Sequence, residues 1–192
     1  MLERRRSKFA ARLRRLLPGR MLRRFARKQD GSAAVEFSLV AIPFLALMFA
    51  ILETALVFWA GQTLEAAATD SARLIMTGQA QTAGFNKTDF KQAVCDRLVN
   101  GLFNCSNGVH VDVKSYTNFS SVSTSSPVSN GQLDTSSMTY TPGGPGSIVV
   151  VRIYYEWPIY VSLLGNNLSN LNGSKRLLVA TSVFRNEPYG SS

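Results

Sequence analysis

The sequence has 192 residues and a formal net charge of +9, and this charge is unevenly distributed along the chain. Residues 1–30 contain twelve lysines and arginines against two acidic residues, whereas the remaining 162 residues contain nine basic against ten acidic residues. The basic pI therefore describes an N-terminal tail and does not indicate a nucleic-acid-binding protein. One histidine and two cysteines are too few for a typical structural zinc site, and we expect no metal, no cofactor and no enzymatic activity.

A long apolar segment follows the basic tail. Phe37–Ala60 supplies the roughly 20 apolar residues that a helix needs to cross a bilayer, with Glu53 as its only charged residue. At 1.5 Å per residue, Glu53 would lie about 24 Å beyond Phe37. We therefore expect Glu53 near the far headgroup region, where Phe58 and Trp59 form an interfacial belt. A packing or partner contact inside the membrane is the alternative for Glu53.

The flanking charges predict the orientation of this span. Because twelve basic residues precede it, the N-terminus should stay in the cytoplasm and the C-terminal part, about 130 residues, should lie outside. A cleaved secretory signal ending near Ala66–Ala68 is the competing interpretation. The apolar stretch is longer than the usual 7–15 residues of such signals, and polar residues crowd that site.

The helix should continue beyond the membrane. Good helix formers predict helix from Ser32 to about Thr77, with a kink at Pro43 and a stop at Gly78. The chain then divides into a basic leader (residues 1–31), a long membrane-spanning helix (residues 32–78) and an extracytoplasmic domain (residues 79–192).

A short helix and a disulfide are expected in the outer domain. Apolar residues at helical spacing predict a helix over Thr88–Asn100, with Thr88 as its N-cap. Cys95 lies in this helix and Cys105 just beyond its end. Outside the cytoplasm two cysteines ten residues apart are best interpreted as one disulfide, with free or redox-active thiols as the alternative.

Three strands complete the predicted α+β domain. They cover residues 109–116, 148–161 and 176–184, and Pro158 should end or bend the second strand. Together they form a small antiparallel sheet packed on the Cys95 helix. Alternation places His110 and Asp112 on the solvent face of the first strand. Residues 120–147 are rich in serine, threonine, glycine and proline and should form an irregular, mobile loop.

The string GSAAVEF at residues 31–37, with a basic leader before it and an apolar helix after it, resembles the processing site of type IV pilins and pseudopilins. The resemblance implies that a membrane-embedded aspartyl peptidase cuts after Gly31, so that the mature chain starts at Ser32. Glu36 and Phe37 would then take part in subunit pairing, with the Glu36 carboxylate offsetting the new α-amino group of Ser32 or of a neighbouring subunit. The alternative is that Glu36 only marks the membrane edge.

The ordered set of segments resembles one pilus family more closely. The apolar helix is followed by ATDSARLIMTGQAQ, FKQAVCDRL and VHVDVKSYTNF, and the chain ends with LLVATSVFRNEPY. Together these segments resemble the TadE-like pilus-assembly proteins, minor pseudopilins of the Tad/Flp tight-adherence pilus systems. The resemblance implies an inner-membrane protein. The sequence contains no base-reading module, so we expect no nucleic-acid partner. The implied partners are a prepilin peptidase, other Tad pilins and pseudopilins, and the inner-membrane pilus assembly platform.

An uncleaved single-span membrane protein is the alternative function. Phe9, Leu13 and Leu16 interleave with arginines in the basic tail, a pattern able to lie on anionic lipid or to contact a cytoplasmic partner. N-terminal sequencing distinguishes the two, because a pseudopilin loses this tail and a tail-driven anchor keeps it.

Overall fold

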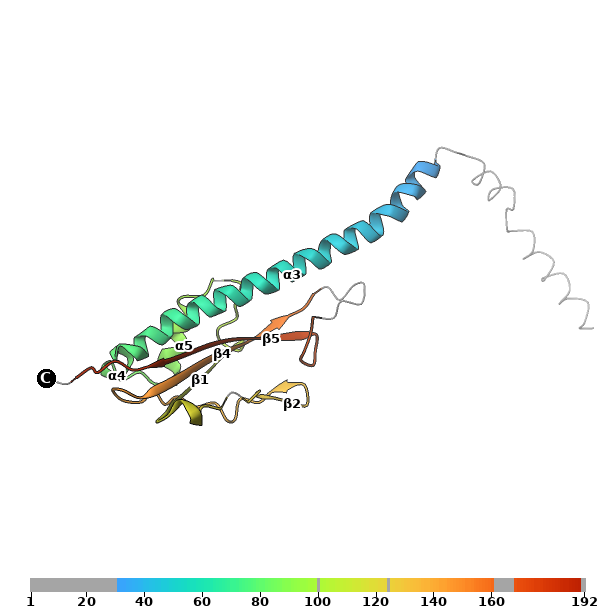
Figure 1. Ribbon diagram of the computed structural model, residues 1–192. Coiled ribbons are helices and arrows are strands. Elements are labelled where there is room, and N and C mark those ends of the chain that lie inside the picture. The colour runs from blue at the N-terminus through green and yellow to red at the C-terminus, as the bar shows by residue number, and fades with distance from the viewer. Residues whose placement is uncertain (1–30, 100, 124, 161–167, 191–192) are drawn as a thin grey trace, which may run out of the picture. The chain divides into compact units, whose positions relative to one another are not determined.

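The structure is a computed structural model that describes residues 31–99, 101–123, 125–160 and 168–190 (Figure 1). The basic leader up to residue 30 lies outside the described residues. Inter-residue contacts divide the chain into a unit that ends at Ala46 and a compact unit that begins at Leu47. The compact unit therefore includes the second part of the long helix. The domain boundary that the sequence suggests at residue 78 remains a prediction.

Three α-helices come first in the described chain, and the strands and a 3-10 helix follow. The helices are α3 (Ser32–Met76), α4 (Gln79–Thr82), α5 (Lys87–Cys95) and the 3-10 helix η3 (Phe119–Ser121). The strands are β1 (Val109–Tyr116), β2 (Val128–Ser129), β3 (Gln132–Leu133), β4 (Ile148–Pro158) and β5 (Lys175–Arg185). The predicted α+β class, with a long N-terminal apolar helix before a small domain, is confirmed.

Helix α3 has two kinds of surface along its length. Its first part exposes large apolar side chains on every side, and it contains a window that is long and apolar enough to cross a membrane and is not buried. From Glu53 onward a stripe of residues three or four apart is buried, which is one face of an amphipathic helix. The stripe consists of Glu53, Val57, Ala60, Leu64, Ala67, Ala68, Ser71, Ala72 and Ile75.

The end of α3 is determined by a glycine, as predicted. The helix ends at Met76, and Gly78 adopts a left-handed conformation with a φ of 77° that glycine tolerates best. A Cβ atom at Gly78 would lie 2.3 Å from the ring of Tyr189. The Glu187 N–H donates a hydrogen bond to the Met76 carbonyl at 2.9 Å. The C-terminal segment therefore packs over this helix end, and a larger residue at position 78 would displace it.

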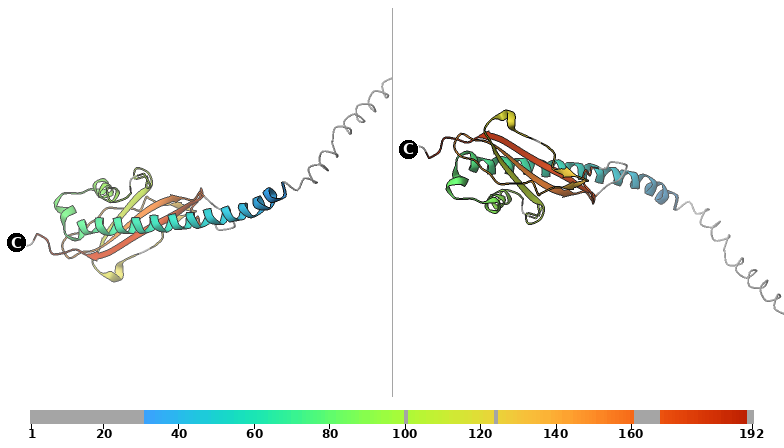
Figure 2. Two further views of the ribbon diagram at one scale, coloured as in Figure 1. Left: turned by 90° about the horizontal axis from the view of Figure 1, so that it is seen from above. Right: turned by 90° about the horizontal axis from the view of Figure 1, so that it is seen from below.

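The main sheet is antiparallel with the order β1-β4-β5. The central strand β4 pairs with both neighbours. It ends at Pro158, as predicted, because proline cannot donate a ladder hydrogen bond. The register aligns Val111 with Ile153 and Ile153 with Ala180, so apolar side chains of all three strands share one face. Figure 2 shows the second part of α3 lying along this sheet.

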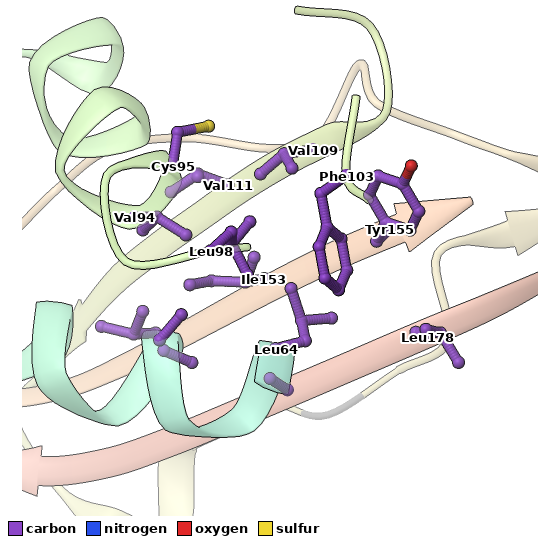
Figure 3. Close-up of a cluster of buried hydrophobic side chains, with 14 of the residues drawn as sticks. Leu64, Val94, Cys95, Leu98, Phe103, Val109, Val111, Ile153, Tyr155 and Leu178 are labelled. Atoms are coloured by element: carbon purple, nitrogen blue, oxygen red, sulfur yellow. The ribbon is translucent and has the colours of Figure 1, made fainter. Parts of the chain in front are cut away.

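One hydrophobic core fills the space between the helices and this face of the sheet. Figure 3 shows Leu64 of α3, Val94 of α5 and Ile153 of β4 converging there, with further side chains from β1 and β5. The sequence predicted that the sheet would pack on the Cys95 helix. The structure shows that α3 also covers it, because small alanines in the buried stripe allow the helix to approach closely.

The opposite face of the sheet is covered by part of the segment expected to be an irregular loop. Met138 is buried there with Tyr154 of β4, Leu177 of β5 and Leu171, which precedes β5. Strands β2 and β3 form a small hairpin in this segment. Its turn residues Asn130 and Gly131 have φ angles of 51° and 73°, which is the conformation that an Asn-Gly hairpin turn requires. The prediction of a wholly irregular loop is therefore wrong.

Helix α5 begins earlier than predicted. Its N-cap is Asn86, whose Oδ1 accepts hydrogen bonds from the backbone N–H groups of Thr88 and Asp89 at 2.7 and 3.1 Å. The Asp89 carboxylate accepts from the Asn86 N–H at 3.0 Å, which completes a capping box. Thr88 is therefore a residue of the first turn, and its prediction as the N-cap is wrong, because the asparagine satisfies two free N–H groups.

Candidate functional site

The segment Gly31–Phe37 is exposed at the start of α3. Gly31 precedes the helix, and a Cβ atom placed on it would meet no atom within 4 Å. Its φ is not in the left-handed region, unlike that of Gly78. Neither packing nor backbone conformation within the described part of the chain therefore requires a glycine at position 31. The Phe37 side chain is 74% exposed, so it is available to a partner surface.

Ser32 and Glu36 are joined by a hydrogen bond across one helical turn. The Ser32 Oγ donates to Glu36 Oε1 at 2.9 Å, and both residues are exposed. The i to i+4 spacing puts the carboxylate on the same helix face as residue 32. If Ser32 became the N-terminus, its positive α-amino group and this carboxylate would lie within one turn of each other. The role of Glu36 in subunit pairing remains a prediction.

Glu53 is the one acidic residue of the buried stripe on α3. Its side chain is 5% exposed, and its Oε1 accepts a hydrogen bond from the backbone N–H of Tyr160 at 3.3 Å. Sequence reasoning expected Glu53 near lipid headgroups, with a packing contact as the alternative. The structure shows a packing contact, made to a residue that lies 107 positions further along the chain.

A pocket with three basic side chains lies where α5 meets β1. Lys87, Lys91 and His110 line a cavity of about 160 Å³. Lys87 Nζ donates to the Met138 carbonyl at 2.8 Å, and Lys91 Nζ donates to the Ser106 carbonyl at 2.9 Å. Burial and the nearby Lys91 charge lower the pKa of His110, and burial and the Lys87 charge lower the pKa of Lys91. His110 is half-buried, whereas the strand pattern placed it on the solvent face.

A second pocket, of about 270 Å³, runs between α3 and β5. Thr54, Val57 and Phe58 line it on the helix side, and Leu178 and Val179 line it on the strand side. The sequence did not predict it, because its two walls come from segments more than 100 residues apart.

Asp112 is buried, so its prediction on a polar solvent face is wrong. Its side chain is 3% exposed, and its Oδ2 accepts a hydrogen bond from Arg152 Nη2 at 2.9 Å on the adjacent strand. Its Oδ1 accepts a hydrogen bond from the Thr139 N–H at 3.0 Å. Thr139 belongs to the segment that covers this face of the sheet. This carboxylate is therefore occupied in an internal network. Within the described ranges, no group of three or more histidine, cysteine or acidic side chains could hold a metal ion.

Cys95 and Cys105 form a disulfide in the compact unit, with 5.9 Å between their Cα atoms. It joins the last residue of α5 to the turn before β1. Gly31, Ser32, Glu36 and Phe37 belong to the first unit, so the predicted site residues form two separate groups along the chain.

A family model matches part of the chain, and the match includes the N-terminal motif. The family model described as TadE-like protein matches residues 31–73, which include Gly31, Ser32, Glu36 and Phe37 as well as nearly all of α3. No curated protein and no solved structure is significantly similar to the chain. The predicted resemblance to TadE-like proteins is thus confirmed over residues 31–73, which contain the exposed motif and nearly all of the apolar helix.

Proposed function

We propose that this chain is a minor pseudopilin that takes part in assembly of a Tad/Flp-type type IV pilus, after prepilin-peptidase-like cleavage that follows Gly31. The observation that carries the proposal is the TadE-like match over residues 31–73. This match begins at the glycine of the expected cleavage site and continues through the apolar helix. The family thus points to the Tad pilus system, and the finer role is our inference.

The surroundings of Gly31 support recognition by an external peptidase. No contact or backbone angle in the described chain explains a glycine there. A peptidase that binds the segment in its active site would instead select a residue without a side chain. Because Gly31 is exposed, it is also accessible to such an enzyme.

Exposure along α3 supports membrane insertion of its first part. Phe44, Phe49 and Ile51 are each about half or more exposed to solvent, although they are strongly apolar. Lipid would cover these side chains, and the described α3 offers one segment long enough to span a bilayer. The twelve basic residues before it favour a cytoplasmic N-terminus, an inner-membrane location and an extracytoplasmic domain. The Cys95–Cys105 disulfide agrees with an oxidising compartment on that side.

Glu36 would pair subunits during assembly. Once the helix leaves lipid and enters a bundle, its carboxylate and the α-amino group of Ser32 are two charges in an apolar environment. Because an unpaired buried charge is unfavourable, pairing between them would set the axial register of neighbouring helices. The partners we infer are the other Tad pilins and pseudopilins, the prepilin peptidase and the inner-membrane assembly platform.

A helix replacement in the native host tests this function. The wild-type chain should restore Tad pili to a strain that lacks the chain. A chimera that keeps residues 1–31 and Glu53 onward, with an unrelated transmembrane helix in place of residues 32–52, should reach the membrane without restoring pili. Its control is immunoblotting of the membrane fraction. Full piliation by the chimera, or normal pili in the strain lacking the chain, would contradict the proposal.

A further inference from the structure

Glu53 attaches the end of strand β4 to one turn of α3. Val57 and Ala60, the next residues of the buried stripe, are apolar, so Glu53 is a charged residue type among buried apolar neighbours. It is 5% exposed, and it accepts the Tyr160 backbone N–H, two residues beyond the end of β4. Ile159, just before Tyr160, is also buried, at 8% exposure. The backbone of this segment is therefore held against the helix at the level of Glu53.

The side chain of Tyr160 behaves differently from its backbone. Its ring is 79% exposed, more than Phe58 at 71% or Trp59 at 49% on α3. The aromatic residues of β4 that precede it, Tyr155 and Trp157, are almost fully buried in the core. An aromatic ring directed outward from a fixed backbone is suited to an external contact.

The level of Glu53 on α3 lies within the exposed apolar surface of the helix. Ile51, Leu52 and Leu56 around it are 44–61% exposed. Phe58 and Trp59 come five and six residues after Glu53, about 8–9 Å further along the axis at 1.5 Å per residue. If Glu53 lies in the headgroup region, as its position in the span predicts, then Tyr160 is held at the same depth, and Phe58 and Trp59 lie further out.

We propose that Tyr160 inserts its ring into the lipid headgroup region beside α3, so that the outer domain has a second membrane contact in addition to its helix. This proposal rests on the membrane insertion in the proposed function. Tyrosine suits the location because its ring is apolar and its hydroxyl stays hydrated, which is why tyrosine is enriched at membrane interfaces. The lipid that would cover Ile51 and Leu56 on the helix continues directly to this ring.

A cationic side chain stands at the same end of the sheet. Lys175 is paired with Pro158 in the strand register, and it is 46% exposed as a side chain. Its Nζ contacts Glu156 at 2.6 Å and retains donors for an anionic headgroup. With the helix and Tyr160 both in contact with the bilayer, the compact unit has a defined tilt relative to the membrane surface.

Site-specific photocrosslinking of the full chain tests the contact. A photoreactive benzoylphenylalanine is placed at position 160, 49 or 183 in separate chains, each reconstituted in vesicles of phosphatidylethanolamine and phosphatidylglycerol. Phe49 is the control for membrane insertion, and Val183 is an exposed control on β5, eight residues beyond Lys175. After irradiation, mass spectrometry should find lipid adducts at positions 49 and 160 and none at 183.

Two outcomes overturn the inference, and they are distinguishable. Adducts at position 49 without adducts at 160 would show that α3 inserts while Tyr160 does not touch lipid. Absence of adducts at position 49 would instead contradict the membrane insertion on which the proposed function depends.

A matched pair of variants tests the role of Glu53 with the same probe. Glu53→Gln retains a carbonyl acceptor for the Tyr160 N–H and should retain the adduct at position 160. Glu53→Ala removes the acceptor and should lose that adduct while keeping the one at position 49. An undiminished adduct at position 160 in Glu53→Ala would show that Glu53 does not hold Tyr160 in place.

Discussion

Asp112 and Arg152 face each other across β1 and β4 as a buried ion pair, with 2.9 Å between Oδ2 and Nη2. Their side chains are 3% and 10% exposed. Asp112 also accepts the Thr139 N–H, and Arg152 Nη1 donates to the Ser125 carbonyl at 3.2 Å. The ion pair therefore joins β1 and β4 to the segment that covers them, at Ser125 and at Thr139. Removal of either partner would leave the other charge buried and uncompensated.

Asp112→Ala should lower the free energy of unfolding by about 3–5 kcal/mol, because Arg152 would lose its charge partner in a buried location. Denaturant unfolding of the chain in detergent measures this change. Lys114→Ala is the matched control: Lys114 also contacts Asp112, at 3.2 Å, but it is 31% exposed and should cost about 1 kcal/mol or less. Equal effects of the two substitutions would show that burial of the Asp112–Arg152 pair does not matter.

His110 should make the fold less stable in mild acid. Its pKa lies below the ordinary value of 6.5, first because burial disfavours the charged form and second because Lys91 is close. Lys87 also lowers it, whereas Glu156 and a backbone hydrogen bond at Asn107 raise it. Near and below pH 6.5 the unfolded chain therefore binds more protons than the folded chain. The free energy of unfolding should fall as the pH drops through 6.5 toward the folded pKa.

The chain has one histidine, so its NMR signals report this pKa directly. Titration of the His110 ring protons should give a value below 6.5, and Lys91→Met should raise it by removing a positive charge. His110→Gln should weaken the loss of stability between pH 7.5 and 5.5. A folded-state pKa at or above 6.5 would show that burial and Lys91 do not disfavour the charged form of His110.

Loss of the disulfide should destabilise the compact unit without affecting membrane insertion of the first part of α3. The closed loop between Cys95 and Cys105 is short, so the chain-entropy model gives about 2–3 kcal/mol. Cys95→Ser should therefore lower resistance to protease while membrane insertion stays normal. Alkylation of the native, non-reduced protein provides the direct check. Modification of both thiols there would show that the disulfide does not form in the cell.

Local patterns were sufficient to predict the main elements of the fold. The run of apolar residues gave α3, Gly78 gave its end, and alternation gave β1. The burial of Asp112 could not be predicted in this way, because alternation places its side chain on one face without showing what covers that face. The cover comes from residues 125–140, whose polar composition suggested a loop. The Asn130-Gly131 dipeptide was the available signal for the hairpin there.

The candidate site was predicted in part. The motif from Gly31 to Phe37 is contiguous in sequence, so its residues could be named from the sequence alone. The contact between Glu53 and Tyr160 joins residues 107 positions apart, and no local pattern could predict it. The sequence nevertheless contained one hint, because a lone carboxylate inside an apolar segment needs a partner or water.

Glu36→Ala should prevent assembly while membrane insertion and cleavage remain. The apolar span from Phe37 onward is sufficient for insertion, and Gly31 and the leader are unchanged. The α-amino group of Ser32 would lose its partner on leaving water, at a cost of roughly a few kcal/mol per interface. Pilus counts and crosslinking to the pilus machinery measure the effect. Glu36→Asp should be milder than Glu36→Gln, which keeps size and loses charge.

Normal piliation and normal crosslinks in Glu36→Ala would show that Glu36 only marks the membrane edge. The hydrogen bond from Ser32 supplies a further control. Ser32→Ala removes this bond but leaves the α-amino group, so it should assemble far better than Glu36→Ala.

The mass of the mature N-terminus tests most directly whether the chain is cleaved after Gly31. The full chain is purified from membranes of cells with and without the prepilin peptidase, and its N-terminal peptide is identified by mass spectrometry. We predict a chain that begins at Ser32 when the peptidase is present and a precursor that keeps residues 1–31 when it is absent. Gly31→Leu should give the precursor even with the peptidase. A chain that still begins at Met1 in cells with the peptidase would contradict this cleavage and favour an uncleaved anchor with a basic tail. A chain that begins after Ala68 would also contradict it and would favour a secretory signal.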